Sequence, residues 1–503
     1  MSDDPRVKAY YEFMEFYKTS RIYDIQYRST GCYDRLLARL GKEPGEEWTD
    51  RERKTFRAYY QYFKDAFYAL GGAKIFLKPE EALLLWLKVY SFQDLGKLSA
   101  AELKKAMGAM WEEIVVASKP DAVKVQTAPS DTKPGILSIL KAATPDHLNV
   151  AFIHQRNPDT STWTKAHDEG REHVEKVLIG KVKVRSFYDA DTPEQAEAAL
   201  AQAVEGGAQV VFTTTPQLSR ATLKAAVKHP KIRFLNCSVN VPYPSIRSYY
   251  GRIYEGKFIT GAIAGAITKG DRIGYVGDYP IFGVPASINA FALGAQMTNP
   301  DARIELRWSC MAGSPLADFM KAGIQVTSNR DIPTTSSNNL EGVYGTYRID
   351  SHGDLVSLAS PVWLWGKSYE NILRSILLGT WDQGKEGEKA VNYWWGMDTG
   401  VIEVKLSDRL PEGVRALAKI LLREMRRGSI DPFFRKIVDQ EGNVRNDGSR
   451  TFTPDQILRI DWLCQNVDGE IPSFERILPI AQPTVRELGV YRDQIPEQKE
   501  GSL

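Results

Sequence analysis

The sequence predicts an α/β region preceded by an all-helical segment, and three observations support this. Apolar and aromatic side chains recur three or four residues apart up to about residue 124, as in amphipathic helices. The next stretch is rich in Thr, Ala, Pro and Ser without apolar periodicity, which is typical of a linker. From Leu148, short apolar runs alternate with helical patterns. We therefore expect a helical domain at 1–125, a linker at 126–146 and an α/β domain at 147–503.

The aromatic residues of the helical segment have two possible roles. They could stack on nucleic-acid bases, or they could form a core that includes a dimer contact. Helical spacing favours the core, and because basic and acidic residues are matched throughout, we expect no nucleic-acid partner. Capping boxes at Thr49–Glu52 and Ser99–Glu102 predict two helix starts. Two of the clusters are Tyr10, Tyr11, Phe13, Met14, Phe16, Tyr17 and Phe56, Tyr59, Tyr60, Tyr62, Phe63, Phe67, Tyr68.

The alternating region predicts parallel sheets with right-handed crossovers. One helix is expected to begin at Thr192, because Pro193 and Gln195 complete a capping box with proline in the first turn. Thr215 and Pro216 repeat the Thr-Pro device. The predicted strands are 149–154, 183–188, 209–213, 232–236, 273–276, 304–308 and 343–347.

Composition limits the class of protein. The 503 residues include 43% hydrophobic and 25% charged residues with a formal charge of +2, as in ordinary globular proteins. No apolar run approaches the roughly 18 residues of a membrane-spanning helix, so the chain is not expected to span a membrane. The N-terminal Met1–Arg6 does not resemble an export signal. As written, the sequence predicts a cytoplasmic protein.

Cysteines and histidines give no sign of a metal or disulfide site. His167 and His173 fall on different helix faces, so a shared ion is not expected. We expect no metal and no cofactor. Reduced, buried thiols are the favoured state of the widely separated Cys32, Cys237, Cys310 and Cys464.

Two glycine-rich stretches resemble ligand loops only superficially. Gly261–Ala266 is expected in the middle of a helix, where close helix packing explains its glycines better than a phosphate site does. The stretch from Gly274 to Gly283 lacks GxGxxG spacing, so a dinucleotide fold is not supported.

The stretch Trp163–Arg171 opens the helix that follows the first predicted strand of the α/β region. In an open α/β sheet, the carboxyl end of a strand and the amino end of the next helix line the ligand crevice. An indole at this position suggests a flat ligand. The sequence therefore favours a binding protein over an enzyme.

Several motifs of the α/β region resemble one family in their order and intervals. They are WTKAHDEGR at 163–171, FTT at 212–214, GRIYEG at 251–256, INAFALGA at 288–295 and WWGM at 394–397. From about Leu148 to Asp468, the chain resembles the basic membrane protein family of PnrA-like substrate-binding proteins of nucleoside ABC importers. The resemblance implies a type I periplasmic-binding-protein fold, with two doubly wound α/β lobes joined by a hinge. It also implies non-enzymatic binding of a purine nucleoside or purine base in the cleft.

The resemblance implies roles for single residues. Trp163 stands where the family keeps an aromatic side chain that stacks on the base, a contact worth about 1–3 kcal/mol; packing on the lobe surface is the alternative. Thr214 could offer its hydroxyl and nearby amides to the ligand, with simple capping as the competitor. Asp350 lies near a family carboxylate that grips ribose hydroxyls. Asp331 falls in a stretch of polar contacts that is altered here, and a solvated loop is the alternative.

Further tryptophans and a charged group complete the expectations. Trp363 and Trp365 match a Trp-x-Trp-Gly pattern of base-binding relatives, and we expect one indole to face the cleft and the other the core. The pair at 394–395 is interpreted as core. Arg252 and Glu255, which flank Tyr254, are expected to pair near the hinge, because buried charges must be paired.

Two departures from the family pattern bear on localisation and ligand. No apolar segment precedes Cys32, so a lipid anchor is not expected. The segment Ser309–Ser314 lacks a tryptophan that base-binding relatives place there, which points to a changed or lost ligand.

Three functions remain open at this stage. The first is a cytoplasmic purine sensor, in which lobe closure is relayed to the helical domain and a signalling partner. The second is a solute receptor of an importer, which would work with an ABC permease. The third, a nucleoside hydrolase, would need paired carboxylates such as Asp331 and Asp350, or a metal-bound water. The sequence favours binding over hydrolysis.

Overall fold

A computed structural model describes residues 123–127, 146–229, 231–238, 246–329, 345–350, 352–381 and 390–491. The chain divides into two compact units. Nearly all described residues belong to the unit formed by Val123–Thr222, Lys231–Pro242 and Ile246–Leu503, to which the following description refers. The expected helical domain and linker lie almost entirely outside the described residues. The predicted boundary between helical domain and linker, after residue 125, falls inside a strand formed by Val123–Gln126.

The first sheet has seven parallel strands in the order β1-β12-β6-β5-β4-β2-β3. Strand β1 joins it at the edge by pairing with β12, so tertiary pairing rather than a helical pattern decides the structure there. Its inner strands β2 and β4 are almost wholly buried, as expected for a parallel sheet covered on both faces. The strands are β1 Val123–Gln126, β2 Leu148–Ile153, β3 Val182–Phe187, β4 Val210–Thr213, β5 Arg233–Cys237, β6 Ile246–Gly251 and β12 Ala390–Trp395.

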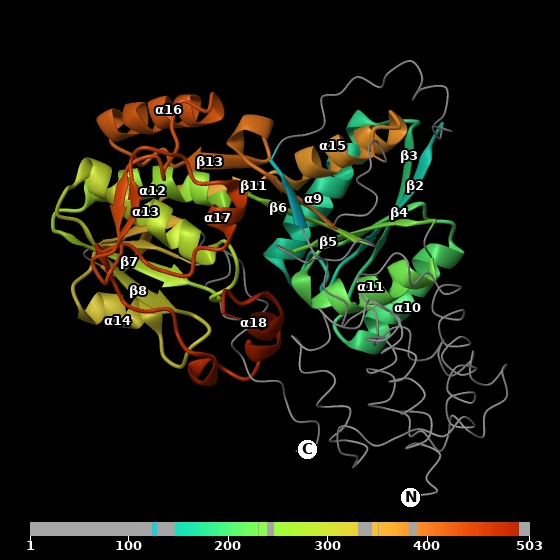
Figure 1. The fold of residues 1–503 in the computed structure, drawn as a ribbon, viewed down its shortest axis with the longest axis horizontal. Helices are drawn as coiled ribbons and strands as arrows, with labels where there is room; N and C mark the ends of the chain where they lie inside the picture. Colours follow the sequence, from blue (N-terminus) through green and yellow to red (C-terminus); the bar gives the residue numbers. More distant parts are fainter. Residues whose placement is uncertain are drawn as a thin grey trace, which may run out of the picture. The chain divides into compact units, whose positions relative to one another are not determined.

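Helices cover both faces of this first lobe, with α9 and α15 on one face and α10 on the other (Figure 1). The capping box predicted at Thr192 is present. Thr215, in contrast, makes no capping hydrogen bond with its side chain and precedes a short 3₁₀ turn. The Thr-Pro pair therefore marks the start of a turn there but does not form a capping box. The elements are α9 Thr162–Val177, α10 Pro193–Glu205, η3 Pro216–Leu218, α11 Ser219–Lys228 and α15 Trp365–Leu377.

The second sheet is mixed rather than parallel throughout. Its order is β13-β11-β10-β9-β7-β8-β16, and β10 runs antiparallel to both of its neighbours, as β13 does to β11. The hairpin between β10 and β11 needs no crossover helix, which explains why a prediction from strand–helix alternation does not find it. The strands are β7 Arg272–Gly277, β8 Arg303–Trp308, β9 Val326–Ser328, β10 Thr346–Ile349, β11 Leu355–Trp363, β13 Ile402–Leu406 and β16 Val467–Asp468.

Helices α12 and α13 pack against each other in the second lobe, and α14 lies on the other side of the sheet (Figure 1). A Cβ at Gly261 would overlap the carbonyl of Phe291, and one at Gly294 would overlap that of Phe258. The predicted close packing at the glycine-rich stretch is confirmed. The remaining elements are α12 Ile253–Ile267, α13 Val284–Thr298, α14 Pro315–Lys321, η5 Met397–Thr399, α16 Glu412–Arg426, β14 Lys436–Val438, β15 Val444–Asp447, α17 Pro454–Leu458, η6 Phe474–Arg476 and α18 Gln482–Leu488.

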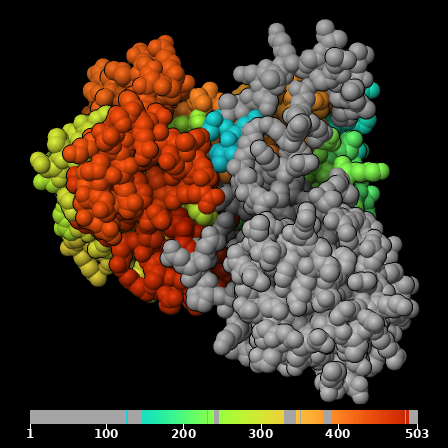
Figure 2. Space-filling model, viewed as in Figure 1, coloured from blue at the N-terminus to red at the C-terminus, as the bar shows by residue number. Residues whose placement is uncertain are grey.

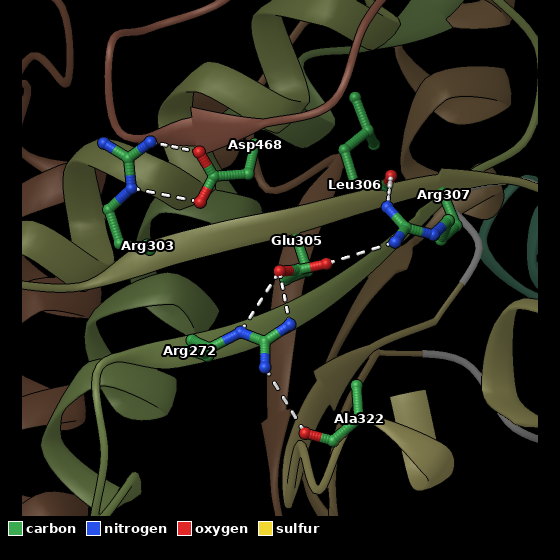
Figure 3. Close-up of polar contacts among 7 residues, drawn as sticks. All are labelled: Arg272, Arg303, Glu305, Leu306, Arg307, Ala322 and Asp468. Carbon is green, nitrogen blue, oxygen red and sulfur yellow. Dashed lines mark hydrogen bonds and ion pairs between the residues drawn. The ribbon is translucent and has the colours of Figure 1, made fainter. Parts of the chain in front are cut away.

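Arginine–carboxylate pairs join neighbouring strands of the second sheet, including its last strand in sequence, β16 (Figure 3). Arg303 on β8 pairs with Asp468 on β16, the last strand of the sheet. Arg272 on β7 and Arg307 on β8 both bind Glu305. Figure 2 shows that orange and red residues, from the C-terminal part of the chain, cover much of the second lobe on the face in view.

Within the described residues, the chain passes between the two sheets at three places. These are the junctions β6 to α12, β11 to α15, and β12 to β13. Two α/β lobes joined by several crossings constitute the type I periplasmic-binding-protein fold, so the predicted fold of the α/β domain is confirmed.

The described residues also give the state of the cysteines and the distribution of possible metal ligands and long apolar helices. Cys237, Cys310 and Cys464 are buried free thiols, and Cys32 lies outside the described residues. Across the described ranges, no group of His, Cys, Asp or Glu side chains is arranged to hold a metal ion. No described helix has the length and apolar character needed to cross a membrane.

Candidate functional site

A pocket opens between the lobes at the carboxyl ends of β2, β4, β5, β6 and β7, which is where ligands bind in open α/β sheets. Its cavity volume is about 70 Å³. Most of the wall is apolar or aromatic, with hydroxyl and amide groups spaced around it. The lining residues are Gln155, Arg156, Ser161, Trp163, Thr164, Thr215, Pro216, Gln217, Ser238, Tyr250, Gly251 and Trp394 from the first lobe, and Ile253, Tyr254, Tyr279, Ile281, Phe282, Gly283, Val284, Ser287, Thr484 and Leu488 from the second.

Trp163 lies in the pocket wall, in the first turn of α9. Ser161 caps this helix by accepting a hydrogen bond from the amide of Thr164, which fixes where the helix starts. The indole is only 6% exposed, and its Nε1 donates to the carbonyl oxygen of Thr214 at 2.8 Å. An indole anchored in this way presents a rigid surface to a ligand, because it has little rotamer freedom left to lose.

Thr214 acts behind the wall rather than in it. Its carbonyl holds Trp163, and its hydroxyl donates to the carbonyl of Ile153 at 3.1 Å, with His154 Nδ1 at 3.2 Å. The side chain is fully buried and does not line the pocket, whereas that of its neighbour Thr215 does. In the structure, Thr214 therefore positions Trp163.

Trp363 and Trp365 pack behind Trp163 instead of facing opposite ways. Their indoles are parallel, with an interplanar angle of 2° and centroids 6.0 Å apart, and each meets Trp163 edge to face at about 5.5 Å. The prediction that they point in opposite directions is wrong, because the segment is not extended throughout: Trp363 ends β11 and Trp365 begins α15, and both indoles contact Trp163. Neither lines the pocket. Trp365 also stacks on His167, at a centroid distance of 4.3 Å.

Asp350, one of the two predicted carboxylates, does not lie at the pocket. Asp350 lies in the turn between β10 and β11, where its Oδ1 accepts hydrogen bonds from the amides of Asp354 at 2.9 Å and His352 at 2.8 Å. These backbone hydrogen bonds lower the pKa of Asp350, and its side chain does not line the pocket. Asp331 lies outside the described residues.

Several lining residues were not predicted. Trp394, interpreted as core, contributes to the pocket wall although it is only 2% exposed. The hydroxyls of the lining residues Thr215 and Ser238 are buried, and neither has a hydrogen-bond partner among the residues that the structure describes. Buried hydroxyls without partners are costly, so a polar ligand atom that reached them would be stabilised. They follow β4 and β5, and their position at strand ends is the signal that could have identified them.

The loop after β2 supplies a cation and an amide to the wall. Asp191 holds both side chains: Arg156 Nη2 lies 3.2 Å from its Oδ2, and Gln155 Nε2 donates to its Oδ1 at 2.9 Å. The Asp191 carboxylate therefore holds the polar side chains of Arg156 and Gln155 at the pocket wall.

The predicted charge pair at the hinge is confirmed. Arg252 Nε lies 2.9 Å from Glu255 Oε1, and Glu255 Oε2 accepts a hydrogen bond from the amide of Met397 at 2.7 Å. Arg252 also pairs with Asp398. Burial raises the pKa of Glu255 to about 7. A Cβ at Gly396 would overlap the Glu255 carboxylate and the Arg252 guanidinium, so a larger residue there would displace the pair. Arg252 and Glu255 lie at the crossing from β6 to α12, and their partners Met397 and Asp398 lie at the crossing from β12 to β13. These contacts therefore join two of the three crossings.

The C-terminal helix α18 forms part of the pocket mouth. It belongs to the second lobe, because the amide of Phe282 donates to Leu488 O and the amide of Val490 donates to Pro280 O, both at 3.0 Å. Across the mouth, Gln217 Nε2 on η3 of the first lobe donates to Thr484 Oγ1 at 3.3 Å. The two lobes therefore touch through a hydrogen bond between two lining residues.

Comparison with known proteins shows what this part of the chain is similar to. Residues 147–313 match the family model described as ABC transporter substrate-binding protein PnrA-like. A purine-binding protein of Brucella abortus is 26% identical over 338 residues, which is 65% of this chain and 95% of that protein. A protein of Haloferax volcanii, provisionally named ABC transporter glucose-binding protein TsgA13, is 28% identical over 273 residues, 50% of this chain and 66% of its own length.

Solved structures also resemble the chain at low identity. An ABC transporter solute-binding protein from Conexibacter woesei is 14% identical with a TM-score of 0.43, covering 56% of this chain and 98% of its own. A transcriptional activator of the comK gene from Bacillus halodurans is 16% identical with a TM-score of 0.45, covering 56% of this chain and 99% of its own.

Proposed function

We propose that this chain binds a purine nucleoside or purine base reversibly between its two lobes, without converting it. The match of residues 147–313 to the model of PnrA-like ABC transporter substrate-binding proteins supports this proposal. The observation that carries the proposal is the pocket at the strand ends, with Trp163 in its wall. A planar heterocycle suits such a wall, since stacking on an aromatic side chain is worth about 1–3 kcal/mol per base.

The chemistry of the wall supports a ligand with both a flat ring and polar edges. Tyr250, Tyr254 and Trp394 add aromatic surface next to the hinge. The hydroxyls of Thr215 and Ser238 can each donate or accept one hydrogen bond. Ligand pockets typically combine a mostly apolar wall with a few such polar groups, which set orientation and specificity. The purine-binding relative from Brucella abortus adds weight to a purine over other flat ligands.

Two biological settings are compatible with this binding. As the solute-binding component of an importer, the protein would deliver its ligand to an ABC permease. As a cytoplasmic sensor, it would pass lobe closure to the N-terminal segment. The family assignment favours the importer. Cell fractionation, combined with a search for permease and ATPase genes beside this gene, distinguishes the two settings.

Ligand binding is tested by calorimetry and thermal unfolding of the full chain with adenine, hypoxanthine, adenosine, inosine, guanosine and glucose. We expect at least one purine to raise the melting temperature, because a ligand that binds only the folded state stabilises it by RT ln(1 + [L]/Kd). Glucose is included because of the name of the Haloferax volcanii relative. Stabilisation by glucose and by no purine would overturn the proposal, and so would release of free base from a nucleoside.

The role of Trp163 is tested by Trp163→Leu against the matched control Trp308→Leu. Trp308 is also buried, at 5% exposed, but lies on β8 away from the pocket lining. Loss of about 1–3 kcal/mol of stacking predicts a purine Kd roughly 5- to 150-fold higher in Trp163→Leu. Both variants lose a buried indole and should lose stability. An equal rise in Kd in the two variants would rule out a direct contact by Trp163.

A further inference from the structure

We propose that the ligand is a free purine base rather than a nucleoside, and that the hydrogen bond between Gln217 and Thr484 closes the pocket over it. This inference rests on the proposed function and narrows its ligand class. Two independent observations carry it: the size of the cavity, and the contact between lobes at its mouth.

The cavity has the size of a base. Its volume is about 70 Å³, and since each water needs roughly 10–15 Å³ of such space, it holds about five to seven water molecules. That number of waters occupies roughly 150–210 Å³ of liquid. A flat bicyclic base has this size, whereas a nucleoside carries an additional ribose ring. The ribose would have to extend out of the cavity through its mouth.

The mouth is where the lobes meet. Gln217 lies in the turn η3 of the first lobe, and Thr484 lies opposite it on α18 of the second lobe. Both residues line the pocket, so their hydrogen bond of 3.3 Å spans its edge. A ribose that extended outward between them would separate donor and acceptor and hold the lobes apart.

The backbone of α18 makes this a defined closure rather than a chance surface contact. Leu488 lines the pocket beside Thr484. Its carbonyl oxygen accepts a hydrogen bond from the amide of Phe282, another lining residue. The helix is thereby attached to the loop that follows β7. Movement of the second lobe carries Thr484 toward or away from Gln217, so the contact reports closure and resists ligand release.

The proposal is tested with matched base and nucleoside pairs, hypoxanthine with inosine and adenine with adenosine, titrated into the full chain by calorimetry. We expect each base to bind at least 10-fold more tightly than its nucleoside. Thr484→Val removes the acceptor at nearly constant shape. In this variant, the base should dissociate 3- to 10-fold faster in stopped-flow measurements. The ratio of the affinity for the base to the affinity for its nucleoside should fall.

The control variant is Thr268→Val, which makes the same change at the end of α12, away from the pocket lining. It should retain wild-type affinity and dissociation rate. A nucleoside that binds as tightly as its base overturns this inference and leaves purine binding intact. A lack of binding by all four compounds overturns the proposed function as well. An unchanged dissociation rate in folded Thr484→Val shows that the contact does not close the pocket.

Discussion

At the scale of single residues, Glu370 fastens the two helices behind the pocket wall. Glu370 Oε2 on α15 lies 2.9 Å from His173 Nε2 on α9, and Lys367 and Arg374 of its own helix also reach the carboxylate, at 3.1 and 3.0 Å. Burial alone would raise the pKa of Glu370. The hydrogen bonds from His173, Lys367 and Arg374 outweigh burial and lower this pKa from 4.5 to about 2.

This lowered pKa predicts a pH-dependent contribution to stability. Because the folded state holds the proton less tightly than the unfolded state, the stabilisation is present above pH 4.5 and is lost as pH falls toward 2. Glu370→Gln should therefore lower the free energy of unfolding by about 1–2 kcal/mol near neutral pH, allowing for partial solvent screening. Urea unfolding across this pH range measures the difference, which should shrink in acid.

Glu205→Gln is the matched control, because Glu205 is exposed at the end of α10. It should change the unfolding free energy little at any pH. A Glu370→Gln difference that stays constant from pH 7 to the acid limit would contradict the assigned role of the carboxylate.

The sequence was sufficient to place Trp163 in the pocket wall, since the rule about strand ends and helix starts applies to a single segment. It was not sufficient for Trp394, because a buried strand residue has the same local pattern in a pocket wall as in a core. Nor could Thr484 be predicted from the sequence, because its partner Gln217 is 267 positions away and only the assembled lobes bring the two together.

At the scale of elements, the pairing of α12 and α13 depends on glycines that let the two backbones approach. Gly294→Ala would drive a methyl group into the carbonyl of Phe258, a backbone atom that cannot turn aside. We expect destabilisation of about 1–3 kcal/mol or more, as for other overpacked interiors. Thermal or urea unfolding of the variant measures the loss.

Gly413→Ala provides the opposite case in another helix. Gly413 lies in α16, and a Cβ there has no atom within 4 Å. Alanine should leave stability unchanged or raise it by up to about 1 kcal/mol, because glycine is the weaker helix former. Equal losses in both variants would show that the tight helix contact is not the cause.

The strands that could be predicted are those followed or preceded by a clear helical pattern, such as β2, β3, β7 and β8. Strands β11, β12 and β13 were not predicted, because they return from one lobe to the other and gain their hydrogen bonds from distant partners. The order of strands in each sheet follows from these returns. Local periodicity does not contain that information.

At the scale of the whole two-lobed unit, the three crossings make relative motion of the lobes the natural response to a ligand. We expect hypoxanthine to slow amide hydrogen exchange in both η3 and α18, which face each other across the pocket mouth. Exchange in the hairpin β14–β15, which contributes no pocket residue, should not change. Slowing confined to one lobe would indicate binding without closure.

The grouping of tryptophans at the crossings has a practical consequence. Trp363 and Trp365 flank one crossing, Trp395 precedes another, and Trp163 contacts the first pair. Indole emission changes in wavelength and intensity when the hydration or the packing of the ring changes. The unmodified protein therefore carries its own optical reporter, and a shift in intrinsic fluorescence on titration would follow the lobes in real time without any attached dye.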